Sequence, residues 1–441
     1  MEWFGEIPDH WEAKKINELF SERRETVSDT NYEPLSVSKG GIVPQIATVA
    51  KTNAGDNRRC VRVGDFVINS RSDRRGSSGV SYYDGSVSLI NIVLTPRAEC
   101  AGRFFHYLLR SHGFIEEYYR NGRGIVADLW TTRYSEMKTI YLPLPPRTEQ
   151  DQIVRFLDWK VSRINKLINA KKKQTALLQE MRQAIINRAV TKGLNPNVPR
   201  KDSGVEWLGE VPEHWGITWI GHLSSIILGK MLQSTPSKNI DTLEKYFCAK
   251  DIHFTGIDTS DLKEMWFSEG DKSMYKVLAG DVLVVEGGAG AGGAFVFQEN
   301  SENNYYVQNS IQILRSKGNT VAKYLYYWLL CIVNRGYIDY ACQKATIPHY
   351  TKEKLFVTPI AVLPHEEQQS IVAYLDEKCA AIDKTINGVN RETSLLHEYR
   401  TRLISDVVTG KIDVHGVEVS ELEAVDEVVE EEVAKMDGDE E

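Results

Sequence analysis

The sequence of 441 residues lacks the features that mark membrane, secreted and zinc-binding proteins. Its longest apolar run, Tyr324 to Val333, has 10 residues, whereas a membrane-spanning helix needs about 20. The six cysteines are scattered without a CxxC pair, which is typical of reduced thiols rather than of disulfides or a zinc site. The first six residues are acidic and aromatic, unlike a secretory signal. We therefore expect a cytoplasmic protein without a metal site.

The common motifs of catalysis are also missing. Gly229-Lys230 and Gly410-Lys411 are followed by apolar residues and not by the Ser or Thr of a P-loop. No Asn/Asp-Pro-Pro-Tyr/Phe motif for amino-group methylation occurs, and the histidines form no HExxH or triad pattern. The glycines of residues 288–293 fit a dinucleotide fingerprint, but a strand is expected after them where that fingerprint needs a helix. The sequence therefore indicates a binding protein with no catalytic residues of its own.

The negative charge of the chain is concentrated at its C-terminus. Residues 416–441 contain 12 acidic residues and one basic residue, a local net charge of −11. Since the whole chain has a net charge of −8, residues 1–415 have a net charge of +3. We expect residues 412–441 to form a disordered acidic tail. The remainder is mildly basic and compatible with a nucleic-acid partner.

The chain is a tandem repeat. Trp3-Phe-Gly-Glu-Ile-Pro-Asp-His-Trp11 recurs 204 residues later as Trp207-Leu-Gly-Glu-Val-Pro-Glu-His-Trp215. Pro146-Arg-Thr-Glu-Gln-Asp-Gln-Ile-Val-Arg-Phe-Leu-Asp158 recurs 218 residues later, from Pro364 to Asp376. Two further matches join residues 62–68 with 278–284 and residues 177–182 with 395–400. Ordered matches at a slowly growing offset indicate a duplication with small insertions in the second copy.

Each copy begins with a globular part, residues 1–146 and 207–364, with a linker at 193–206 between the copies. Short apolar runs alternate with glycine-rich turns, which predicts strands, and one amphipathic helix follows in each copy. The strands are expected at residues 66–68, 89–94, 282–285 and 311–314, and the helices around 104–119 and 321–340. The fold class is therefore α+β, with two duplicated globular domains.

Each copy ends in a proline-free segment, residues 147–192 and 365–411, with apolar residues every three or four positions. This alternation predicts a long helix with a coiled-coil seam. The predicted seam consists of Leu157, Val161, Ile164, Ile168, Leu178, Ile185 and Ala189 in the first copy and Leu375, Cys379, Ile382, Ile386, Leu396, Leu403 and Val407 in the second. A helix of this length spans about 65 Å.

The order of the segments predicts that the two helices form an antiparallel coiled coil. Each helix follows its own globular part, so an antiparallel pair places one globular part at each end. The first helix has 11 basic and four acidic residues and the second has six and eight, which favours pairing. The alternative is two separate helices, each packed on its own globular part. Two similar heads at a fixed separation suit a DNA site whose half-sites lie a helical turn or more apart.

Candidate DNA contacts differ between the copies. The first copy has a basic cluster with a nearby tyrosine: Arg58, Arg59, Arg62, Arg71, Arg74, Arg75 and Tyr82. Arginine guanidinium groups match both phosphate oxygens and the O6/N7 edge of guanine, although a solvated surface is an equal alternative for any one residue. The second copy has the glycine-rich residues 286–293 at the place of this cluster, and its candidates are Lys344, His349, Tyr350 and Lys352. Different contact residues on a common framework imply two different half-sites.

Several motifs together resemble the specificity subunit of Type I restriction–modification enzymes. They are the repeat itself, the His-Trp pair that opens each copy, the Gly-Asp strand motif, the Glu-Gln-x-x-Ile-Val segments at residues 149–154 and 367–372, and the C-terminal residues 399–411. The resemblance covers residues 1–415 and is specific only as a set. The acidic tail has no counterpart in the family pattern.

The resemblance implies two target-recognition domains, each specific for one part of a bipartite double-stranded DNA site, and spacer helices that set the gap. It implies partners as well: two modification subunits with S-adenosylmethionine and an adenine-N6 methyltransferase site, and a restriction subunit that uses ATP and Mg in a motor-nuclease. This chain would bind no cofactor itself. We consider residues 149–154 and 367–372 as helix starts and as partner docking segments. The alternatives are a self-sufficient nuclease or methyltransferase with an unrecognised site, and a coiled-coil adaptor of a phage-defence complex that does not recognise bases.

Overall fold

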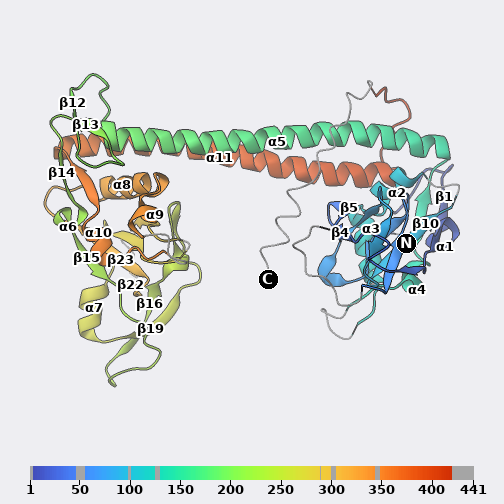
Figure 1. The fold of residues 1–441 in the computed structure, drawn as a ribbon, viewed down its shortest axis with the longest axis horizontal. Helices are drawn as coiled ribbons and strands as arrows, with labels where there is room; N and C mark the ends of the chain where they lie inside the picture. Colours follow the sequence, from blue (N-terminus) through green and yellow to red (C-terminus); the bar gives the residue numbers. More distant parts are fainter. Residues whose placement is uncertain are drawn as a thin grey trace. The chain divides into compact units, whose positions relative to one another are not determined.

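The computed structural model describes residues 3–45, 55–97, 101–124, 130–288, 290–298, 304–342 and 348–419. The chain divides into two compact units (Figure 1). Unit 1 comprises Met1–Lys172 and Asn390–Glu441, and unit 2 comprises Lys173–Val389. The division falls inside the two long helices, α5 (Arg147–Lys192) and α11 (His365–Val408), so each unit contains one part of each helix. The part of each unit outside α5 and α11 is called its head below.

The head of unit 1 is built on small antiparallel sheets. A four-stranded sheet has the order β2-β10-β7-β8, a three-stranded sheet has the order β3-β6-β9, and β1-β11 and β4-β5 form pairs. The strands are β1 Glu12–Lys15, β2 Phe20–Glu22, β3 Thr26–Val27, β4 Leu35–Ser38, β5 Gly41–Pro44, β6 Arg58–Val61, β7 Phe66–Asn69, β8 Ser78–Val80, β9 Gly85–Val87, β10 Asn91–Pro96 and β11 Tyr141–Leu144. All four residues of β7 are buried, because β10 and β8 pair with its two edges and a hydrophobic cluster lies on each face, with Phe66 and Ile68 in one cluster and Val67 in the other.

The head of unit 2 repeats this plan. Its four-stranded sheet has the order β15-β23-β20-β21 and its pair β14-β24 corresponds to β1-β11, while β19-β16-β22, β17-β18 and β12-β13 complete the head. The strands are β12 Arg200–Asp202, β13 Glu210–Pro212, β14 Gly216–Trp219, β15 Ser224–Leu228, β16 Thr242–Phe247, β17 Ile252–His253, β18 Gly256–Ile257, β19 Lys263–Phe267, β20 Val282–Val285, β21 Ala294–Val296, β22 Tyr306–Val307, β23 Ile311–Ser316 and β24 Pro359–Val362. The sequence repeat is therefore a repeat of sheet topology.

The helix expected in each head is broken in two. Short helices in unit 1 are α1 Ile16–Leu19, α2 Gly102–Leu108, α3 His112–Arg120 and α4 Tyr134–Met137, and those in unit 2 are α6 Ile220–Leu223, α7 Glu269–Tyr275, α8 Ala322–Asn334, α9 Tyr337–Ala341 and α10 Lys352–Phe356. The break in unit 1 occurs because Ser111 caps α3, its hydroxyl accepting the Phe114 amide. The break in unit 2 occurs at Gly336, whose φ of 73° ends a helical run.

The long helices begin at duplicated joints. The Gln150 side chain accepts the Ala101 amide and donates to the Pro145 carbonyl, and Gln368 forms the same two bonds with Val321 and Leu363. These contacts satisfy backbone groups next to the first turn of each helix, so residues 149–154 and 367–372 are helix starts fastened to the heads.

In the described part of the chain, no helix is long and apolar enough to cross a membrane.

Within each unit the segments of α5 and α11 pack against each other. The core of unit 1 contains Leu157, Ile164, Ile168, Leu403 and Val407 of the predicted seam, and the core of unit 2 contains Ala189, Leu375 and Cys379. Ile382 is also buried, whereas Val161, Leu178, Ile185, Ile386 and Leu396 are half-buried, and Ile186 is fully buried next to Ile185. The seam is therefore apolar near the heads.

Two corresponding polar contacts give the direction of the helices. Arg400 donates to the Asn165 amide oxygen at 2.6 Å in unit 1, and Arg182 lies 3.0 Å from the Asp383 carboxylate in unit 2. The repeat relates Arg182 to Arg400 and Asn165 to Asp383. In unit 1 an early part of α5 meets a late part of α11, and in unit 2 a late part of α5 meets an early part of α11. The pair is therefore antiparallel, as the order of the segments predicts.

Both long helices end at a glycine in the left-handed region. Gly193 and Gly410 have φ values of 71° and 76°. For this reason the second helix ends at Val408, before the expected residue 411. The expectation of a disordered tail from residue 412 is wrong for residues 412–419, which pack within unit 1: Val414 is 2% exposed, and Gln152 donates to the Val414 and Val417 carbonyls. Residues 420–441 lie outside the described residues.

Candidate nucleic-acid interface

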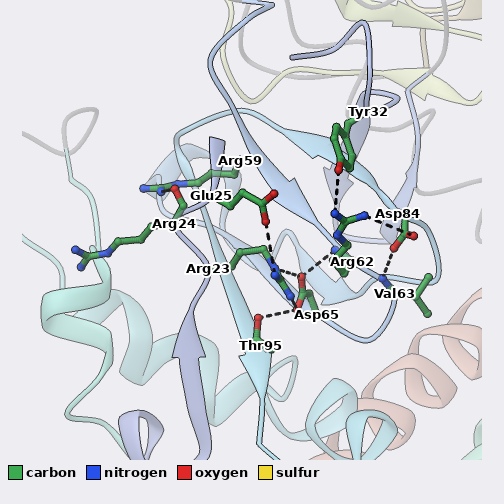
Figure 2. A network of polar contacts seen from close by, with 10 residues as sticks. All are labelled: Arg23, Arg24, Glu25, Tyr32, Arg59, Arg62, Val63, Asp65, Asp84 and Thr95. Atoms are coloured by element: carbon green, nitrogen blue, oxygen red, sulfur yellow. Dashed lines mark hydrogen bonds and ion pairs between the residues drawn. The ribbon is translucent and has the colours of Figure 1, made fainter. Parts of the chain in front are cut away.

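The Gly-Asp motif of each copy organises the turn that leads into the central strand of the main sheet. The buried Asp65 carboxylate accepts the Arg62 amide at 2.8 Å, the Thr95 hydroxyl at 2.9 Å and the Arg23 guanidinium at 2.7 and 3.1 Å (Figure 2). This ion pair raises the pKa of Arg23. The motif is therefore a structural clamp at the entry to β7, and its carboxylate oxygens are bound by groups of the protein itself.

Unit 2 contains the same clamp with one substitution. Asp281 accepts the Leu278 amide at 2.8 Å and a two-point contact from Arg315 at 2.8 and 2.7 Å. Arg315 comes from β23, whereas Arg23 follows β2, so the cation reaches the clamp from a different strand of the corresponding sheet. The carboxylate is 2% exposed in both units. The clamp positions β7 and β20, from which the loops described next emerge.

The predicted basic cluster divides into two parts in the structure. Arg58 is 6% exposed and donates to the Ser86 hydroxyl and carbonyl, and burial lowers its pKa. Arg59 donates to the Arg24 carbonyl, and Arg62 contacts the hydroxyl and the ring of Tyr32 (Figure 2). Arg58 therefore lies inside the head, where it is not available to a ligand. Arg59 and Arg62 lie at the surface, and each already has a hydrogen-bond partner within the protein.

The remaining arginines lie on an exposed turn that includes the 3-10 helix η1 (Ser72–Arg74). Arg71, Arg74 and Arg75 are all exposed. Arg75 forms an ion pair with Glu116 and lies over the Tyr119 ring at 5.2 Å. Among the described residues, the guanidinium groups of Arg71 and Arg74 have no hydrogen-bond or ion-pair partner.

A second loop, which sequence reasoning missed, lies beside this turn. Arg71 pairs with Thr131 in an isolated β-bridge, and Thr131 exchanges two backbone hydrogen bonds with Arg123. The Arg123 side chain is 84% exposed and lies 3.9 Å from Glu136. We call residues 70–76 together with 121–124 and 130–132 the unit 1 loop pair. The sequence indicates the positive charge of the second loop, because Arg120 and Arg123 follow the expected helix, but it does not indicate the pairing of this loop with the turn.

Unit 2 contains a corresponding loop pair, residues 286–288 and 290–292 together with 342 and 348–350. Gly287 pairs with His349 in an isolated β-bridge at the place of Arg71 and Thr131. A Cβ atom on Gly287 would lie 2.8 Å from the His349 ring, so the glycine is needed for this close approach. The His349 side chain is exposed. The two loop pairs therefore have one backbone plan and different side chains.

The other predicted contact residues are distributed over different environments. Tyr350 is fully buried with its hydroxyl 2.5 Å from the Thr358 hydroxyl, and burial raises its pKa, so it belongs to the core. Lys352 is exposed on α10 next to the unit 2 loop pair. Tyr82 is 55% exposed and lies near Tyr107, away from the Arg71 turn, and Lys344 lies outside the described residues.

In the part of the chain that the structure describes, no group of three acidic, histidine or cysteine residues could hold a metal ion.

Duplicated polar contacts fasten each head to a long helix. Asp158 of α5 accepts the Tyr107 hydroxyl at 2.8 Å and Arg103 at 2.9 Å, and Asp376 of α11 accepts Tyr327 and Lys323 at 2.8 and 2.6 Å. Burial raises the pKa of both tyrosines and of Asp158. These joints hold the heads on the helices and thereby set the position of the loop pairs.

Comparisons with known proteins agree with this architecture. Residues 233–391 match the family model described as the Type I restriction modification DNA specificity domain. A putative type I restriction enzyme MjaX specificity subunit from Methanocaldococcus jannaschii is 21% identical, over 93% of this chain and 95% of the relative. A chain from a study of assembly and conformational transition of the type I R-M system has a TM-score of 0.71 at 17% identity, and covers 92% of this chain and 100% of its own. The HsdS subunit from Thermoanaerobacter tengcongensis has a TM-score of 0.51 at 17% identity, with 92% and 98% covered.

The fold is thus that of a duplicated α+β protein with two long helices packed together, as in solved HsdS structures. Residues 233–391 match the DNA specificity domain of type I restriction–modification systems, and nearly the whole chain is similar to a specificity subunit of such a system.

Proposed function

We propose that this chain recognises a bipartite, asymmetric DNA site and directs partner adenine-N6 methyltransferase and motor-nuclease subunits to it in the cytoplasm. The observation that carries the proposal is the pair of corresponding loop pairs. Their backbones share one bridge position, Arg71–Thr131 and Gly287–His349, while their exposed side chains differ. A duplicated framework with different exposed chemistry supports two different half-sites. The cofactors S-adenosylmethionine, ATP and Mg belong to the partners in this proposal.

The decisive experiment is single-molecule methylome sequencing of cells with and without the gene. We expect one bipartite methyl-adenine motif, with different sequences in its two halves, to disappear when the gene is deleted. An unchanged methylome would contradict the proposal. The purified chain is also incubated with DNA, magnesium and S-adenosylmethionine. Methylation or cleavage without a partner would instead indicate a self-sufficient enzyme, and binding without sequence preference would indicate an adaptor.

The modification subunits dock, in this proposal, on the exposed faces of the long helices. Leu177 and Met181 of α5 are 63% and 53% exposed, and their repeat counterparts Leu395 and Tyr399 of α11 are 55% and 48% exposed. Large apolar side chains that remain exposed at both copies of one position favour an interface. Since the patch occurs once in each copy, it supports two modification subunits per chain. The segment 149–154 is less suitable, because Glu149, Gln150 and Ile153 are buried.

Substitution of these residues tests the docking surface. Leu177→Glu and Leu395→Glu are each expected to remove one modification subunit from the purified complex, and the double variant is expected to remove both. Gln174→Glu, a change at another exposed position of α5, is the matched control and should leave the stoichiometry unchanged. The ratio of subunits is measured by native mass spectrometry. Full occupancy in the double variant would exclude this surface.

A further inference from the structure

The unit 1 loop pair presents two arginines on a turn that is held rigidly by its backbone. The Arg71 amide donates to the Asn69 side chain at 3.0 Å, and the Arg71 carbonyl accepts the Tyr119 hydroxyl at 2.9 Å. The second loop adds a bond from the Ser72 amide to the Trp130 carbonyl at 3.2 Å. The backbone of the turn is therefore fastened to β7, α3 and the second loop, while the guanidinium groups of Arg71 and Arg74 extend into solvent.

Arg75, on the same turn, differs from Arg71 and Arg74 because its side chain already has partners within the protein. Arg75 is held between the Glu116 carboxylate and the Tyr119 ring, so much of its hydrogen-bonding capacity and charge is already used within the protein. Arg71 and Arg74 have no such acceptor among the described residues. Their donors are therefore available to an external acceptor, and the rigid turn reduces the entropy lost when they bind one.

We propose that Arg71 and Arg74 recognise guanine in the half-site bound by unit 1. Two parallel donors of a guanidinium group match the O6 and N7 acceptors of guanine in the major groove, and this is the commonest specific contact between arginine and a base. A phosphate would accept from the same donors, but a phosphate contact would not distinguish sequences. The inference rests on the proposed function and assigns a base to one of its two half-sites.

Unit 2 has no arginines at the corresponding positions of its sequence. Its corresponding turn has Gly287 and Gly288 where unit 1 has Arg71 and Ser72, and the exposed side chain at the bridge is His349. The half-site bound by unit 2 is therefore recognised without an arginine at this position. The difference predicts that variants in the two loop pairs affect different halves of one site.

The test uses the complete complex of this chain with its modification subunits. The wild-type methylome first defines the motif; absence of a bipartite motif would overturn the proposed function itself, before guanine recognition is tested. Arg71→Ala and Arg74→Ala are then expected to reduce the preference for guanine at one or two positions of one half by about 10- to 100-fold each. His349→Ala should change only the other half. Arg24→Ala is the control, because this side chain is 75% exposed in the same head and pairs with Glu22.

Duplexes with 7-deazaguanine separate base recognition from phosphate binding, because this base lacks the N7 acceptor. At the assigned position we expect it to weaken binding of the wild-type complex and to have little further effect on the matching arginine variant. Arg74→Lys, which keeps the charge and loses the paired donors, should retain overall affinity and lose guanine preference. A uniform loss of affinity across all sequences, or equal sensitivity of wild type and variants to 7-deazaguanine, would overturn the proposal.

Discussion

At the scale of single residues, burial decides which of two similar side chains remains available. Arg58 and Arg71 belong to the same cluster in sequence, but Arg58 binds Ser86 in the interior and Arg71 extends from an exposed turn. His106 of α2 is a half-buried polar residue. Its Nε2 lies 2.6 Å from the Arg110 guanidinium, a contact that requires a lone pair on this nitrogen. Burial, with Arg110 and Arg103 nearby, lowers the pKa of His106 to about 3.

The low pKa of His106 predicts that the folded state of unit 1 loses stability in acid. An unfolded histidine has a pKa near 6.5, so between pH 6.5 and 3 the unfolded state binds one more proton and the folded state loses stability as the pH falls. Between pH 6.5 and 5, His106→Gln should remove a pH-dependent loss of about 2 kcal/mol in the free energy of unfolding. Hydrogen exchange of unit 1 amides measures it, with unit 2, which has Tyr326 at the corresponding position, as an internal control. Parallel pH profiles of wild type and variant would contradict the assignment.

At the scale of secondary-structure elements, glycine has two different roles in the long helices. It is required where each helix ends, and it is only tolerated inside α11. Gly410 ends α11 with a positive φ, and a Cβ atom there would lie 2.4 Å from Pro8. Gly193 ends α5 in the same way against Trp215, the repeat counterpart of Trp11. Gly388 lies within α11 and a Cβ atom on it would meet no atom within 4 Å. The corresponding residue of the first copy is Ala170.

Two glycine substitutions should therefore have opposite effects. Gly388→Ala is expected to raise the free energy of unfolding by about 0.5–1 kcal/mol, because alanine loses less backbone entropy in a helix. Gly410→Ala should lower it by at least about 1–2 kcal/mol through the left-handed backbone, with the contact to Pro8 adding to the loss. Urea denaturation of the full chain measures both. Changes of the same sign in the two variants would show that the helix ends are assigned incorrectly.

At the scale of the whole molecule, charge is distributed unevenly along one chain. The total of −8 combines a tail of −11 with a body of +3, so net charge alone says little about DNA binding. The exposed basic side chains on or next to the two loop pairs are Arg71, Arg74 and Arg123 in unit 1 and Lys352 in unit 2. Contacts of basic side chains with DNA phosphates release counterions when they form.

Binding of the complete complex to its site should therefore depend steeply on salt. A plot of the logarithm of the association constant against the logarithm of the salt concentration is expected to be linear, with a slope of about −0.9 for each phosphate neutralised. Lys352→Ala should make this slope less steep by about one, and should weaken binding to all sequences alike. Fluorescence anisotropy from low to physiological salt measures both effects. An affinity that does not change with salt would contradict phosphate-driven binding.

The sequence predicted the framework better than the contact surface. The order of the repeats and the helical periodicity gave both long helices and their antiparallel direction, and the structure confirms the α+β fold. The single helix expected at 104–119 was wrong, because Ser111 caps a new helix after one tight turn. The pairing of Arg71 with Thr131 had no local signal, because it joins segments 60 residues apart in the chain.

Local rules therefore account for one part of this protein and long-range contacts for the other. Periodicity, turn residues and internal repetition depend on near neighbours, so the sequence alone already determines the duplication, the long helices and the Gly-Asp turns. Burial depends on which distant segments meet, so only the tertiary structure decided that Arg58 and Tyr350 belong to the interior while Arg71, Arg74 and His349 remain exposed. The two loop pairs result from both: their positions come from the repeated framework, and their chemistry comes from the residues in which the copies differ.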